Sequence, residues 1–138
     1  MPQPPQSNRD NQHALAASRY ASSRTPAAQA RDEDAQVLLK AARMMQDVYD
    51  GWDNADRVNV EKTIKYNRQI WTIFYDSALN PSANQKESFT AISKNIASLA
   101  TFVFQRSLDI IADPQRDKLR VLVTINREIA AGLMYRGD

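Results

Sequence analysis

The apolar residues of this chain recur with the spacing of α-helices. In one segment, apolar side chains and a single asparagine follow one another at steps of three and four: Val60, Ile64, Asn67, Trp71, Phe74 and Ala78. The arrangement is repeated near the C-terminus by Leu119, Leu122, Asn126, Ile129 and Leu133. Such steps place side chains on one face of a helix. The pattern therefore predicts long amphipathic helices.

Cap residues and turn residues give approximate helix boundaries. The predicted helices span about 25–49, 53–79, 83–112 and 114–135, with a short additional helix over 13–22. Thr25-Pro26 and Asp113-Pro114 each combine an N-cap residue with a proline suited to the first helical turn. Gly51 stands where a left-handed C-terminal cap is expected. Ser82 and Gln85 have the spacing of a capping box.

Length and composition favour a single all-α domain. A chain of 138 residues with only three glycines is long enough for one domain and poor in the turns that an all-β fold needs. We predict a helical bundle of four long helices plus a short N-terminal helix. Residues 1–12, rich in Pro, Gln and Asn, are predicted to be a disordered tail. The helical domain would then span 13–137.

The composition excludes several classes of function. The chain has no cysteine and one histidine, His13, and its glycines do not form a phosphate-binding loop. The acidic run at Asp32, Glu33 and Asp34 lacks the spacing of a calcium loop. We therefore expect no enzymatic activity, no metal and no cofactor.

Charge and hydropathy bear on the compartment and the partners. The formal net charge is +2, from 18 basic and 16 acidic residues that are interspersed along the chain. Nucleic-acid-binding domains usually concentrate basic residues on one face, so direct contact with RNA or DNA is not expected. The first ten residues have no apolar stretch resembling a signal peptide, and no later apolar run is long enough for a membrane span. The expected location is the cytoplasm.

Two asparagines lie within the apolar stripes and require an explanation. A carboxamide among apolar side chains costs stability unless its hydrogen bonds are satisfied. We therefore expect Asn67 and Asn126 to lie close together, or each to bond a backbone carbonyl at a helix terminus, and so to fix how the helices align. The neighbouring Arg68 and Arg127 lie at the edges of the stripes, within reach of carboxylates on another helix or on a partner. Gly132, inside the last helix, suggests close helix packing.

The predicted fourth helix carries more apolar side chains than one face holds. Phe102, Phe104, Leu108 and Ile111 lie well beyond its main stripe. One interpretation is a bundle core with contacts on several sides. The other is a surface that accepts an amphipathic helix from another protein.

Three motifs, taken in order, resemble the FlaF family of flagellar biosynthesis regulators. They are Asn67-Arg68-Gln69-Ile70-Trp71-Thr72, Ser98-Leu99-Ala100-Thr101-Phe102-Val103 and Ile125-Asn126-Arg127-Glu128-Ile129-Ala130-Ala131-Gly132-Leu133. The resemblance extends over roughly residues 14 to 135. The chain departs from the family's pattern at Asn80-Pro81-Ser82, where a leucine-proline turn is more typical, and at Asp34, where a glutamate is.

The resemblance implies a cytoplasmic, non-enzymatic protein that promotes flagellin synthesis or secretion alongside FlbT. The mechanism it favours is chaperoning, in which the protein binds new flagellin and keeps it competent for export. We predict contact through the third and fourth helices, with Trp71 or Phe104 nearest to the client. The predicted partner-binding residues are Arg68, Ile70, Trp71, Phe102, Phe104 and Arg127.

Two other interpretations stay open at this point. The protein would act as a post-transcriptional regulator, through FlbT or on flagellin mRNA, or as a structural adaptor that works by oligomerisation. Direct RNA contact needs a track of basic residues. The candidates for such a track are scattered in the sequence: Lys62, Lys65, Arg116, Lys118 and Arg120.

Overall fold

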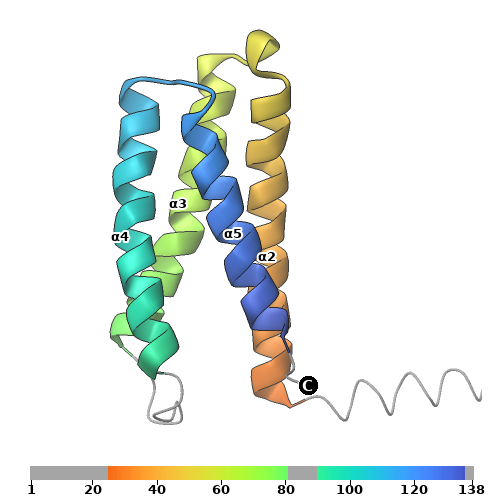
Figure 1. The fold of residues 1–138 in the computed structure, drawn as a ribbon, viewed down its shortest axis with the longest axis vertical. Coiled ribbons are helices and arrows are strands. Elements are labelled where there is room, and N and C mark those ends of the chain that lie inside the picture. The colour runs from red at the N-terminus through yellow and green to blue at the C-terminus, as the bar shows by residue number, and fades with distance from the viewer. Residues whose placement is uncertain (1–24, 81–89, 136–138) are drawn as a thin grey trace, which may run out of the picture.

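The fold is an antiparallel bundle of helices. A computed structural model describes residues 25–80 and 90–135, with the side chains of the second range described from Asn95 onward. Within these ranges it contains α2 (Pro26–Asp50), the 3-10 turn η1 (Trp52–Asn54), α3 (Arg57–Leu79), α4 (Thr90–Ala112) and α5 (Lys118–Met134), and no strand. Successive helices run in opposite directions (Figure 1). The predicted all-α class is confirmed, whereas the predicted tail 1–12 and helix 13–22 lie outside the described residues.

The start of α2 follows the predicted cap, and its end does not. Thr25 Oγ1 accepts a hydrogen bond of 3.0 Å from the Ala28 amide, and Pro26 occupies the first turn. At the other end, the Gly51 amide donates to the Asp47 carbonyl at 3.0 Å. Gly51 has φ −101° and ψ 26°, so the predicted left-handed cap is wrong. The backbone keeps a negative φ at Gly51 because the chain passes directly into the 3-10 turn η1.

Two predicted helix starts are also wrong, because the residues predicted as caps take part in other local structure. Asp53 and Asn54 belong to η1, and the N-cap of α3 is Asp56, whose Oδ1 accepts from the Asn59 amide at 2.7 Å. The last helix begins at Lys118, not at Pro114. Asp113 is used differently there: its carboxylate accepts from Gln115 Nε2 at 2.9 Å and lies 3.4 Å from Lys118 Nζ. The predicted capping box at Ser82 and Gln85 lies outside the described residues.

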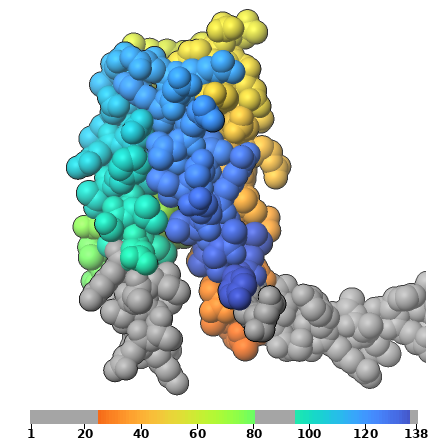
Figure 2. Space-filling view, viewed as in Figure 1, coloured from red at the N-terminus to blue at the C-terminus, as the bar shows by residue number. Residues whose placement is uncertain are grey.

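The four helices pack as two closely associated pairs. The contacts between α2 and α5 and between α3 and α4 are extensive, whereas those between α2 and α3 are fewer and those between α4 and α5 are very few. On one face of the molecule α5 lies between α4 and α2 (Figure 2). The helices α4 and α5 lie close together near their connection and diverge toward the other end (Figure 1). The bundle therefore has two weak seams, one between α2 and α3 and one between α4 and α5.

The core is formed by the predicted stripes. Its buried apolar residues in the described ranges are Ala35, Leu38, Ala41, Ala42, Met45, Val48, Val60, Ile64, Ile70, Trp71, Ala100, Val103, Ile110, Leu119, Leu122, Val123 and Ala130. Near the α4–α5 connection the large side chains of the stripes, such as Leu119 and Ile110, are completely buried. Toward the diverging ends, the corresponding side chains Leu99, Ile129 and Phe74 are only half-buried. None of the helices in the described part of the chain has the length and apolar content of a membrane span.

Gly132 does not support close packing, contrary to the sequence-based expectation. It is exposed, and a Cβ added there would meet no atom within 4 Å. The small residue that lies buried on α5 is Ala130, which shares the interior with Ala35 and Ala42 of α2. Small side chains on both helices allow the close approach of α2 and α5.

Replacing Gly132 with alanine is therefore expected to stabilise the protein by about 0.5–1 kcal/mol, because alanine has the higher helix propensity and the site has room for a methyl group. Chemical unfolding followed by circular dichroism measures the change. Destabilisation would show that the glycine serves a purpose other than packing.

Candidate functional site

A hydrogen-bonded cluster of polar side chains lies at the centre of the bundle. Asn126 Nδ2 donates to Asn67 Oδ1 at 2.8 Å and to the Leu38 carbonyl at 3.2 Å. Trp71 Nε1 donates to Asn126 Oδ1 at 3.0 Å. The three side chains have no solvent-exposed surface. The cluster joins α2, α3 and α5, and it confirms that the two asparagines lie close together.

The bonding partners fix the orientation of each amide. The indole N–H of Trp71 only donates and the Leu38 carbonyl only accepts, so the Asn126 oxygen must face Trp71 and its nitrogen must face α2. The second Asn126 N–H then requires the oxygen of Asn67. As a result Asn67 Nδ2 has no hydrogen-bond partner among the described residues. The Leu38 carbonyl lies in the middle of α2. The alternative prediction, that each asparagine bonds a backbone carbonyl at a helix terminus, is therefore wrong.

The cluster orients helices and offers no surface to a partner. Asn67, Trp71 and Asn126 are completely buried, and Ile70 is nearly so. A client would reach Trp71 only if the bundle opened. Among the described residues no group of three His, Cys, Asp or Glu side chains could hold a metal ion.

One carboxyl of the acidic run of α2, that of Asp34, lies in surroundings that disfavour its negative charge. Partial burial, together with the neighbouring Glu33, raises the pKa of the Asp34 carboxyl above its ordinary value.

The other predicted partner-binding residues do not form one patch. Phe104 contacts Tyr75 of α3 in an edge-to-face arrangement, with 5.8 Å between ring centroids. Phe102 lies on another side of α4, where the guanidinium of Arg106 is 5.5 Å from its ring centroid. Arg68 is half-buried on α3, and Arg127 is exposed on α5. The structure brings Asn67 and Asn126 together with Trp71, leaves Gly132 exposed and apart from them, and distributes the other predicted contact residues over separate surfaces.

Phe102 lies on the side of α4 that faces α5. It shares a helix face with Asp109, seven residues on, whose Oδ1 is 3.1 Å from Nζ of Lys118. On α5, Ile125 lies seven residues after Lys118 and so faces α4 in turn. We call this surface the α4–α5 seam. Its apolar residues are the half-buried Leu99, Ile125, Ile129 and Leu133, with the more exposed Phe102 at its edge.

The α4–α5 seam has charged contacts at one end and half-buried apolar side chains along the rest. Near the connection, Lys118 Nζ contacts both the Asp109 carboxylate and, at 2.8 Å, the Asp113 carbonyl. Farther along, the half-buried apolar side chains of the seam continue to where the two helices diverge (Figure 1). Phe102 keeps 36% of its surface exposed.

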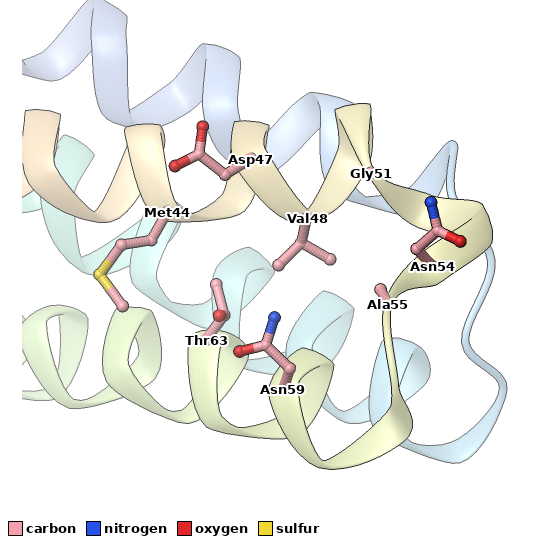
Figure 3. A pocket seen from close by; sticks show the side chains of 8 residues that line it. All are labelled: Met44, Asp47, Val48, Gly51, Asn54, Ala55, Asn59 and Thr63. Atoms are coloured by element: carbon pink, nitrogen blue, oxygen red, sulfur yellow. The ribbon is translucent and has the colours of Figure 1, made fainter.

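A second accessible surface lies between α2 and α3. Two cavities, of about 330 and 510 Å³, follow each other along this seam, and Met44 lines both. Met44 and Val48 of α2 and Asn59 and Thr63 of α3 lie between the two helices in the smaller cavity (Figure 3). This surface was not predicted from the sequence. Its one signal was Val58, an apolar residue outside the stripe of its helix.

The comparisons with known proteins identify the family. The model of the family described as "Flagellar protein FlaF" matches residues 16–133. The chain belongs to the FlaF family. No curated protein and no solved structure matches it. Membership makes it a flagellar protein, consistent with a role in flagellum biosynthesis, and confirms the resemblance drawn from the three motifs.

Proposed function

We propose that this FlaF protein binds newly made flagellin in the cytoplasm and keeps it unassembled until export. The observation that supports the proposal is the α4–α5 seam, an apolar surface left accessible in a protein of a flagellar family. Flagellin has long amphipathic helices that must stay soluble before secretion. Such a helix would lay its apolar side along Phe102, Leu99 and Ile129.

This proposed binding surface differs from the one predicted from the sequence. The contact was expected on the third and fourth helices, but α3 and α4 pack extensively on each other and Trp71 lies in the interior. Of the six expected contact residues, Phe102 alone belongs to the α4–α5 seam as defined above. It is the residue on which the proposal is tested.

Replacing Phe102 with aspartate is expected to reduce the amount of co-purified flagellin at least severalfold, because a charge on the α4–α5 seam must be desolvated when the client packs there. The experiment is co-expression of tagged FlaF protein with flagellin, followed by affinity purification. Leu108→Asp is the matched control: Leu108 is 59% exposed on the same helix but does not belong to the seam. Equal losses of co-purified flagellin in the two variants would contradict the proposed binding surface.

The alternative is regulation of flagellin expression through FlbT or flagellin mRNA. The basic residues considered for RNA do not form one track: Arg116 Nε donates to the Tyr49 carbonyl at 2.9 Å, and Lys118 binds Asp109 and Asp113. Lys62 and Lys65 line a different surface, on the outer side of α3. Salt-sensitive binding of flagellin mRNA by the purified protein, without flagellin co-purification, would replace the chaperone proposal with the regulatory one.

A further inference from the structure

The α2–α3 seam contains a groove with an apolar centre. The larger cavity, of about 510 Å³, is lined by Met44, Val58, Glu61, Lys62, Lys65, Tyr66 and Gln69. Val58, an aliphatic residue in the first turn of α3, is 74% exposed. Farther along the outer side of α3, Ile73 is 63% exposed. We call this surface the α2–α3 groove.

The groove has a basic rim whose charges are not neutralised within the described chain. Lys62 and Lys65 line the cavity from α3, and neither has a carboxylate partner among the described residues. Lys40 approaches from α2, with its Nζ 5.6 Å from the ring centroid of Tyr66. Glu61, the acidic residue of this cavity, is paired with Arg57 at 3.3 Å. The rim therefore carries an excess of positive charge beside an apolar floor.

The dimensions of the groove suit a helix. From Val58 to Gln69 the α3 side of the cavity spans twelve residues, or about 16 Å at the helical rise. α3 supplies six of the seven lining residues and α2 supplies Met44, so a partner helix would pack along α3 beside α2, as neighbouring bundle helices do. About three turns of a partner helix would cover the apolar floor.

We propose that the α2–α3 groove binds an amphipathic helix of a partner protein that carries acidic residues beside its apolar stripe. The stripe would cover Met44, Val58 and Tyr66, and the partner's carboxylates would pair with Lys62 and Lys65. Charge complementarity selects this partner: an acidic flank neutralises the rim, and a basic flank is repelled by it. The groove lies on the other side of α2 from its contact with α5, and the proposal does not depend on flagellin binding at the α4–α5 seam.

The test uses the full-length protein and two fluorescein-labelled synthetic helices of 18 residues. Both peptides have a leucine stripe, flanked by glutamates in one and by lysines in the other. Fluorescence anisotropy is expected to show one-to-one binding of the acidic peptide, weakened by salt, and much weaker binding of the basic peptide. Equal binding of both peptides would overturn the proposal.

Charge reversal locates the binding surface. The double variant K62E/K65E is expected to weaken binding of the acidic peptide by roughly tenfold or more. R120E/R127E, in which two exposed arginines of α5 are reversed, has the same change in net charge and is expected to bind as the unmodified protein does. Equal losses in the two variants would overturn the proposal.

Two further measurements address other occupants of the groove. Concentration-dependent self-association that K62E/K65E abolishes, measured by sedimentation, would assign the groove to a second copy of the chain and overturn the proposal. Binding of a labelled oligouridine that the same variant abolishes, with no binding of the acidic peptide, would assign it to nucleic acid and also overturn it. Absence of both effects, with peptide binding retained, supports a protein helix as the occupant.

Discussion

Replacing Asn126 with leucine is expected to lower the free energy of unfolding by about 3–5 kcal/mol, because it leaves several buried polar groups without partners. Asn126 accepts from Trp71 and donates to both Asn67 and the Leu38 carbonyl. Without it, the indole N–H and the Asn67 carboxamide lose the partners that they have in the interior. Leucine has as many side-chain heavy atoms as asparagine and is bulkier, so the cost comes mainly from the stranded polar groups and not from a cavity.

The same substitution at Asn67 is expected to cost less, about 1–2 kcal/mol. Asn67 makes one hydrogen bond to Asn126, and its Nδ2 already lacks a partner among the described residues. Leucine removes that unsatisfied donor together with the bond. The two sites are thus unequal although they look alike in the sequence.

The double variant N67L/N126L is expected to be less destabilised than the sum of the single variants, by about 1–2 kcal/mol, because it no longer leaves an isolated carboxamide in the core. Urea unfolding of the four proteins, followed by circular dichroism at 222 nm, gives the coupling. Independent, additive effects would show that the two asparagines do not act as a pair.

Replacing Trp71 with phenylalanine is expected to lower the free energy of unfolding by about 2–4 kcal/mol. The variant loses the N–H that donates to Asn126 Oδ1, and the smaller ring leaves space in a completely buried site. Trp52→Phe is the matched control, because Trp52 is only half-buried and lies in η1. Its expected cost is below about 1 kcal/mol.

Trp71 also discriminates between a structural role and a role in client binding. Once the amount of folded protein is taken into account, Trp71→Phe is expected to co-purify flagellin as well as the unmodified protein does, because the side chain has no exposed surface. Loss of flagellin from a variant that is still folded would restore Trp71 as a contact residue. It would also imply that the bundle opens when the client binds.

Local sequence signals predicted the helices well and their ends less well. The stripes of Val60, Ile64 and Trp71 and of Leu119 and Leu122 became core, because a helix buries the face on which apolar side chains repeat. Thr25 with Pro26 located one helix start correctly. At Asp113 the same kind of signal failed, because the carboxylate contacts Lys118 and Gln115 instead of capping a helix.

The position of Gly132 shows the limit of such reasoning. A glycine in a helix indicates either close packing or a site without packing demands, and the sequence does not say which neighbour lies beside it. In the structure the site is open, and Ala130 is the small residue buried on α5. Val58 shows the same limit. A single exposed apolar residue outside a stripe did not indicate the α2–α3 groove that it lines.

The sequence by itself determined the helical class, the faces that form the core and the membership of the FlaF family, because each depends on residue types and spacing along the chain. The tertiary structure alone decided which helices pair closely and which leave seams. It also brought the side chains of Asn67, Trp71 and Asn126 and the carbonyl of Leu38 into one hydrogen-bonded cluster. The residues that meet there from different helices are 29 to 88 residues apart in the sequence. Helical periodicity specifies which face of a helix is buried but not which helix packs against that face. The surface that stays accessible depends on how the helices pair.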